Sequence, residues 1–132
     1  MNGEQELSAI LELHPDLHDG GYGTARPASF GTATPESRAA LLARVAAFVA
    51  CKQWIADNLA PSQRMNLWRT SYGMKHIAER EIGYVTNGTF IAAMLACGYR
   101  MERKPHYNPH FAIAELSARA AERAPRPLGS RL

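Results

Sequence analysis

Residues 34–60 carry the pattern that most constrains the fold of this chain. Apolar side chains recur there at steps of three and four residues, which places them on one side of an α-helix: Leu41, Leu42, Val45, Phe48, Val49, Ile55 and Leu59. Thr34 is a favourable N-cap, Pro35 suits the first helical turn and Pro61 ends the segment. We therefore predict one long amphipathic helix at the centre of a mainly α-helical domain.

Two shorter helical segments follow it. The first covers SYGMKHIAEREI, with Ser71 as its cap and Gly83 at its end. The second covers GTFIAAMLACGY, which Thr86 or Asn87 caps and Gly98 closes. A helix, a polar turn and a second helix are the outline of a DNA-reading helix-turn-helix.

A short β-hairpin is predicted near residues 99–113. YRMERK alternates apolar and charged side chains, KPHYNP supplies a turn, and HFAI is the candidate partner strand. A rival interpretation begins a helix at Asn108. We favour the hairpin, followed by a C-terminal helix from about Ala114. Together with the helix-turn-helix-like pair, this order is winged-helix-like.

The charge of the chain is divided unevenly. Residues 1–36 hold six Asp or Glu and one Arg, a net −5, whereas the other 96 residues hold 14 Lys or Arg and six Asp or Glu, a net +8. We predict an acidic, loop-rich arm over 1–33, a helical domain over 34–124 and a flexible basic tail over 125–132. The basic body indicates DNA or RNA as partner, although the same charge also serves solubility alone.

The second helix of the pair lacks the side chains of a DNA-reading helix. A recognition helix offers polar or basic groups to base edges, but apolar residues cover nearly the whole circumference of GTFIAAMLACGY. Only Thr86, Asn87 and Thr89, at its N-terminal end, are placed to reach a base. We therefore interpret this helix as core, or as the contact of a homodimer.

Basic and aromatic residues around this helix are the candidate contacts for nucleic acid or another partner. Phosphates are held by Lys and Arg, and bases stack on aromatic side chains. The candidate binding residues are Tyr72, Lys75, His76, Arg80, Thr86, Asn87, Arg100, Arg103 and Lys104. The competing interpretation is a solvated charged rim, with aromatic residues such as Trp68 carried into the core.

One helix face also has the composition of a catalytic site. Tyr72, Lys75, His76 and Glu79 fall on adjoining positions, where a tyrosine beside a lysine and a histidine can move a proton. The simpler interpretation is a polar face with a Lys75–Glu79 ion pair. Because no second motif supplies catalytic carboxylates, we predict that the protein is not an enzyme.

The remaining signals argue against several classes of site. His14 and His18, like His106 and His110, stand four residues apart but lack the further ligands that zinc requires, so we expect neither a metal nor a cofactor. No apolar run reaches the roughly 18 residues of a membrane span, and the acidic N-terminus is unlike a signal peptide. Two isolated cysteines suit a reducing compartment, and we predict a cytoplasmic protein.

A set of residues between Trp68 and Ile113 carries a resemblance. The set comprises Ser71, Tyr72, Gly73, Lys75 and His76; Tyr84, Val85, Thr86, Asn87, Gly88, Phe90, Ile91 and Ala93; Gly98, Tyr99 and Arg100; and Asn108 with Phe111. In these residues the chain resembles a group of small proteins of bacterial genomic islands, plasmids and prophages. The resemblance covers about a third of the chain and implies a mobile-element origin without implying an activity.

Small non-catalytic proteins of mobile elements are of two main kinds. Some bind nucleic acid as regulators or accessory factors, and others inhibit host defence machinery, as anti-CRISPR and anti-restriction proteins do. We expect an accessory protein that binds nucleic acid mainly through phosphate contacts. The alternative is a protein-binding inhibitor of a nucleic-acid-binding host defence complex, to which a basic surface is also suited.

Overall fold

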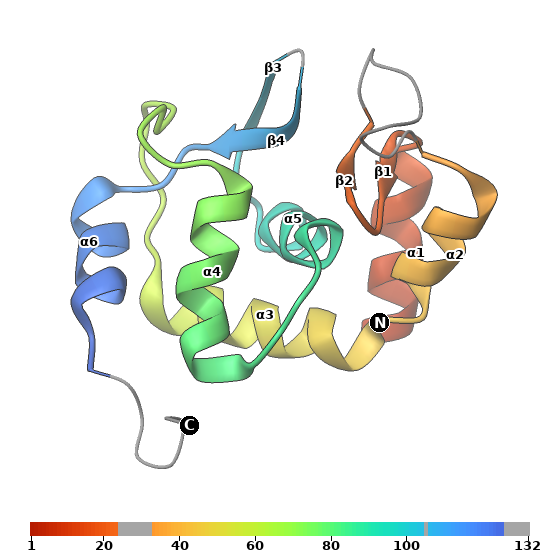
Figure 1. Ribbon diagram of the computed structural model, residues 1–132, viewed down its shortest axis with the longest axis horizontal. Coiled ribbons are helices and arrows are strands. Elements are labelled where there is room, and N and C mark those ends of the chain that lie inside the picture. Colours follow the sequence, from red (N-terminus) through yellow and green to blue (C-terminus); the bar gives the residue numbers. More distant parts are fainter. Residues whose placement is uncertain (24–32, 105, 126–132) are drawn as a thin grey trace.

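The computed structural model describes residues 1–23, 33–104 and 106–125 of the chain (Figure 1). Its helices are α1 (Gly3–Leu13), α2 (Pro35–Leu42), α3 (Val45–Asn58), α4 (Ser71–Ile82), α5 (Asn87–Ala96) and α6 (Glu115–Arg123). Its strands form two antiparallel hairpins, β1 (Leu17–His18) with β2 (Gly21–Tyr22) and β3 (Met101–Lys104) with β4 (His106–Phe111). The predicted mainly α-helical domain with a small hairpin is confirmed.

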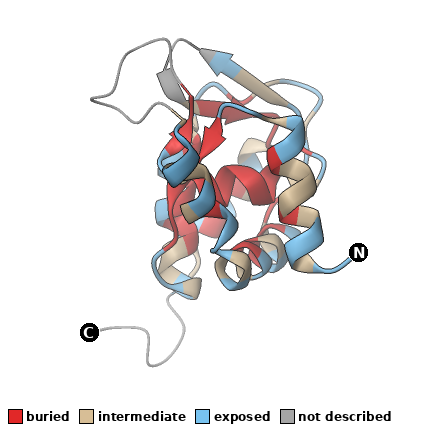
Figure 2. Ribbon diagram, turned by 90° about the vertical axis from the view of Figure 1, so that its right-hand side faces the viewer, coloured by how far each residue is buried: buried red, intermediate tan, exposed pale blue. Residues whose placement is uncertain are grey.

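Helix α5 lies at the centre of the domain. Figure 1 shows it end-on, with α3 below it, α4 and α6 on one side and α1 on the other. Every residue from Asn87 to Met94 is buried, and Figure 2 shows this buried helix lengthwise among helices with exposed outer faces. Phe90 and Met94 fill the middle of the core. The interpretation of this segment as core is therefore confirmed, because a helix apolar on all sides is stable only when surrounded.

The prediction of one long helix over residues 34–60 is wrong. Helices α2 and α3 are separate and are bent by 64°, with Arg44 between them in a non-helical conformation. The guanidinium of Arg44 forms an ion pair with Asp19 at 3.0 Å. Because of the bend, Leu41 and Phe48 both reach the core, whereas their neighbours Leu42 and Val49, assigned to the same apolar stripe, are exposed.

Residues 1–23 form part of the folded domain and not a loop-rich arm beside it. Leu7 and Leu11 of α1, with Leu17 of β1 and Tyr22 of β2, are buried in the common core. The guanidinium of Arg38 on α2 donates to the backbone carbonyls of Leu11, at 2.6 Å, and His14 at the end of α1, and to that of Leu17 in β1. Carbonyls at the end of a helix lack partners within that helix. The rest of the predicted arm, 24–32, and the tail from residue 126 lie outside the described residues.

The sequence predicts the C-terminal end of α4 and the N-cap of α5 correctly. Gly83 ends α4 with a φ of 83°, as predicted, and the Oγ1 of Thr86 accepts a hydrogen bond from the Thr89 amide as the cap of α5. The cap of α4 is Thr70, whose hydroxyl accepts from the Gly73 amide at 3.2 Å. Ser71, the predicted cap, lies instead in the first turn of the helix and is buried.

The hairpin β3–β4 and helix α6 follow the favoured prediction. Met101 pairs with Phe111 across the hairpin, and the register shifts between Glu102 and Lys104. The chain then begins α6 at Glu115, so no helix starts at Asn108. The backbone of Ile113 also pairs with Pro61, which ties the end of the hairpin to the loop between α3 and α4. This loop, residues 59–70, is held against the hairpin and α6.

Candidate nucleic-acid interface

Asn87 and Thr86 are buried, and their polar atoms are used within the fold. The Oδ1 of Asn87 accepts from the hydroxyl of Ser71 at 2.9 Å, and its Nδ2 donates to the Oδ1 of Asn108 at 2.8 Å and to the carbonyl of Gly20 at 3.4 Å. Asn87 thereby joins α4, β4 and the turn between β1 and β2. The prediction of Thr86 and Asn87 as exposed base contacts is corrected: they hold the first turn of α5 in place.

Lys75 is also buried, with 4% of its surface exposed. Its Nζ lies 2.9 Å from the Oε2 of Glu79, which confirms the predicted i,i+4 ion pair. The same Nζ stands 5.0 Å and 5.1 Å from the ring centroids of Tyr72 and Tyr84, within cation–π distance. Lys75 therefore serves as a bridge between α4 and the following turn, and it is withdrawn from the set of phosphate contacts.

Glu79 connects this lysine to the turn before α5. Its carboxylate accepts from Lys75, from the backbone amide of Val85 at 3.1 Å, and lies 2.9 Å from the Nδ1 of His76. Burial acts to raise the pKa of Glu79, but the hydrogen bonds from Lys75 and Val85 outweigh it, and the pKa is lowered from its ordinary value. Glu79 is thus ionised at neutral pH, and its two oxygens are already occupied.

The outer side of α4 is different, because it carries exposed rings. Trp68, just before the helix, is 89% exposed, and Tyr72 is 47% exposed. The His76 side chain is half exposed, and its ring centroid lies 4.4 Å from that of Tyr72 in an edge-on arrangement. We call Trp68, Tyr72 and His76 the aromatic ridge. Trp68 is therefore not carried into the core.

A shallow depression lies on each side of the aromatic ridge. The first, of about 370 Å³, lies toward α6 and is lined by Trp68, Arg69, Thr70, Gly73, His76, Ile77, Arg80 and Glu122. The second, of about 340 Å³, lies toward the β1–β2 turn and is lined by Asp19, Gly20, Tyr72, Lys75, His76, Glu79, Tyr84, Thr86 and Asn87. The ridge therefore separates an arginine-lined hollow from the buried Lys75–Glu79 network.

The arginines of the first depression differ in how their charge is balanced. Arg69 lies 2.7 Å from Glu115 and 3.1 Å from Glu122, two carboxylates of α6. Its hydrogen bonds lower the pKa of Glu115 to about 2. Arg80 donates to the backbone carbonyl of Ala124 at 3.0 Å, and a neutral carbonyl orients the guanidinium without cancelling its charge. Arg80 is therefore the cation of this hollow best suited to an anionic ligand.

The basic residues predicted on the hairpin do not line the two depressions beside the ridge. Arg103 forms an ion pair with Asp16 at 3.4 Å and lies 4.5 Å over the ring of Tyr22, on the other side of the domain. Arg100 is exposed, and its guanidinium donates to the carbonyl of Gln63 in the 59–70 loop, the loop that also carries Trp68. The side chain of Lys104 lies outside the described residues.

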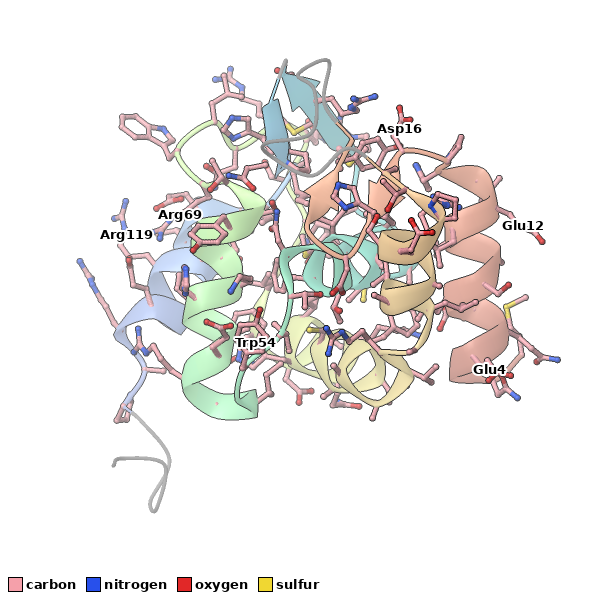
Figure 3. The ribbon with its side chains drawn as sticks, turned by 45° about the vertical axis from the view of Figure 1, so that its right-hand side comes forward. Glu4, Glu12, Asp16, Trp54, Arg69 and Arg119 are labelled. Atoms are coloured by element: carbon pink, nitrogen blue, oxygen red, sulfur yellow. The ribbon has the colours of Figure 1, made fainter. Side chains whose placement is uncertain are left out.

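All charged side chains of α1 are acidic, whereas α4 and α6 carry charges of both signs. In Figure 3 the labelled Arg69 and Arg119 lie on the side of α4 and α6, whereas Glu4, Glu12 and Asp16 lie on the side of α1. The carboxylates of α1 disfavour an anionic ligand on that side of the domain. The structure brings together Tyr72, His76 and Arg80 of the predicted residues there, and it adds Trp68 and Arg69.

Trp68 is a candidate binding residue that the helical patterns of the sequence do not single out. Its signal in the sequence is its position: it follows Pro61 and precedes the next helix, outside every apolar periodic stretch. A large aromatic residue in a polar connection is more often a binding residue than one within a helix stripe.

No protein family, curated protein or solved structure is matched by this chain. Among residues 1–23, 33–104 and 106–125, no single helix has both the length and the apolar composition to cross a membrane; α2 and α3 reach that length only as a bent pair. Over the same ranges, no three His, Cys, Asp or Glu side chains are grouped to hold a metal ion.

Proposed function

We propose that this protein binds nucleic acid without catalysis, as a cytoplasmic accessory protein of a bacterial mobile element. The observation that carries the proposal is the exposed Trp68, which lines the same depression as Arg80. This depression lies along α4, on the opposite side of α5 from the acidic helix α1 (Figure 1). Exposed aromatic residues and cations with free charge are the two components of a surface that holds a nucleic-acid strand.

Arg80 and Arg100 are the proposed phosphate contacts. Each guanidinium is oriented by backbone carbonyls and has no carboxylate partner within the described part of the chain. Neutralising phosphates releases condensed counterions, so binding should weaken steeply as salt rises. Because α5 is buried along Asn87 to Met94, no second helix enters the major groove, and binding should show little sequence preference.

The test is the salt dependence of binding to a labelled oligonucleotide, measured by fluorescence anisotropy. Arg80→Gln and Arg100→Gln should each weaken binding and lower the slope of log affinity against log salt by about 1. Lys52→Gln is the matched control, because it removes one cation whose partner is Glu6 of α1, away from the ridge. Absence of binding at low salt, or an equal loss in the control, would contradict the proposal.

A second candidate function is inhibition of a host defence complex through a protein contact. It is favoured by the pairing of two exposed apolar side chains, Leu67 and Trp68, next to the Arg69–Glu115 ion pair. A tryptophan surrounded by arginines is the composition of an interface hot spot. Capture of one defined partner protein from host extract, unchanged by nuclease and lost in Trp68→Ala, would favour this function over nucleic-acid binding.

A further inference from the structure

We infer that the aromatic ridge takes a single strand of nucleic acid in preference to a duplex, with bases stacked on Trp68 and phosphates near Arg80. This inference rests on the proposed function and names the class of its ligand. It depends on three features of the described residues: rigid presentation of Trp68, exposed ring faces along α4, and the place of the arginines relative to those rings.

Trp68 is exposed although the loop that carries it is firmly held. The Trp68 amide donates to the Oδ1 of Asn66 at 3.0 Å. Asn66 is itself buried, and its Nδ2 donates to the carbonyl of Ile113 at 3.0 Å and to Glu115 at 2.9 Å. The indole is therefore presented from an ordered support, which lowers the entropy lost when a ligand binds.

The ridge offers what an unpaired base requires. Ring faces bind the faces of bases, and each stacked base contributes whatever its identity. In a duplex those faces are covered by neighbouring base pairs, and a protein meets only the backbone and the groove edges. A surface that reads groove edges needs a protruding polar helix or strand, whereas the helix in that position here, α5, is enclosed. The exposed rings therefore suit a single strand.

Arg80 is the cation that this depression offers to a phosphate. Trp68, His76 and Arg80 line the depression together with Arg69 and Glu122, which form an ion pair with each other. Gly73 also lines it, and within 4 Å a β-carbon built there would meet only the Oγ1 of Thr70, at 3.6 Å. The surface of α4 between the rings and Arg80 is therefore uncrowded at this position.

The experiment follows the fluorescence of Trp68 during titration with oligothymidylate, oligouridylate and a duplex hairpin, each of about 16 nucleotides, the upper end of site sizes for such surfaces. The chain has two tryptophans, and Trp54 is buried with 3% of its surface exposed. Stacking should therefore quench Trp68 and leave Trp54 unchanged. Both single strands should quench, because a stacking surface reads base faces and not the 2′-hydroxyl.

Three variants test the contribution of the Trp68 ring to binding. Trp68→Ala should weaken single-strand binding about ten-fold and leave duplex binding nearly unchanged. Trp68→Phe should keep most of the affinity but lose the quenching, because the ring remains and the reporter is gone. Leu13→Ala is the matched control, since it removes an exposed apolar side chain of α1 and should change neither quantity.

The outcomes distinguish this inference from the proposed function. Salt-dependent binding of single strand and duplex with equal affinity, without quenching of Trp68, overturns the inference and leaves the proposed function standing. No binding of any oligonucleotide overturns both. Quenching by both single strands, with a loss in Trp68→Ala that the duplex does not share, supports both.

Discussion

Helix α4 carries polar and aromatic residues on two sides that differ in exposure. The sequence alone does not distinguish these two sides. The inner side carries the buried Lys75 and the partly buried Glu79, which form an ion pair. The outer side carries Tyr72 and His76, which are exposed. Polar residues of the inner side hold the domain together, while aromatic residues of the outer side meet solvent. The usual relation between polarity and exposure is reversed, which is why we propose the outer side as the binding surface.

Apart from truncation of the core residue Trp54, the largest loss of stability should come from Gly88→Ala. A β-carbon at Gly88 would overlap the carbonyl oxygen of His18, where the β1–β2 hairpin sits on the start of α5. Backbone must move to relieve the overlap, so we expect a decrease of about 3 kcal/mol or more in the free energy of unfolding, measured by urea denaturation.

Gly73→Ala is the matched control for this substitution. Gly73 lies in α4 with space for a methyl group, and alanine there should raise the free energy of unfolding by about 0.5 kcal/mol. Equal losses in the two variants would show that the β1–β2 hairpin does not depend on close contact with α5.

Lys75→Met should have the next largest effect. It removes the cation from a buried pair and leaves the Glu79 carboxylate enclosed, so we expect a loss of about 3 kcal/mol. Lys52→Met removes the corresponding cation from the more exposed pair with Glu6 and should cost less than about 1 kcal/mol. Thermal denaturation of both variants measures the difference, and similar losses would mean that burial of Lys75 has no energetic consequence.

The ends of the elements could be predicted from the sequence, because they depend on local chemistry. Thr34 caps α2 and Gly83 ends α4 with a positive φ, and both properties belong to a few consecutive residues. The enclosed character of α5 was also predictable, since its composition is apolar on every side.

The burial of the polar residues of α4 and α5 could not be predicted in the same way. Asn87 is buried because Asn108 and Gly20, distant in the sequence, supply its partners. The bend before α3 likewise coincides with the pairing of Arg44 to Asp19, 25 residues earlier. A pattern within one helix contains no information about such partners, so the polar residues of α4 and α5 were assigned to the surface.

Glu115→Gln should produce a smaller loss that depends on pH. The pKa of Glu115 is lowered to about 2, first by its hydrogen bond to Arg69 and then by that to Asn66. A lowered pKa stabilises the folded state above the ordinary value of 4.5, and the contribution disappears as pH falls toward 2. We expect a difference of about 1 kcal/mol between the two proteins at neutral pH, after allowance for solvent screening.

The measurement is urea denaturation of both proteins at several pH values between neutrality and pH 2. The difference should shrink as Glu115 becomes protonated, because a protonated carboxyl and an amide are then nearly equivalent partners for Arg69. Glu12→Gln, at an exposed position of α1, should change stability by less than about 0.5 kcal/mol. A difference between Glu115 and Gln that is constant with pH would show that the ion pair to α6 does not form.

The two tryptophans provide the sharpest contrast between the enclosed and the exposed surface. Substitution of the exposed one should have one of the smallest effects on stability. Trp54 packs against Phe90 in the core, with ring centroids 6.4 Å apart, so Trp54→Ala should cost about 3–5 kcal/mol. Trp68→Ala should change the free energy of unfolding by less than about 0.5 kcal/mol, because the indole buries almost nothing. A large loss in Trp68→Ala would mean that this side chain supports the fold. An unchanged stability is the result expected if the exposed indole belongs to the proposed binding surface and not to the core.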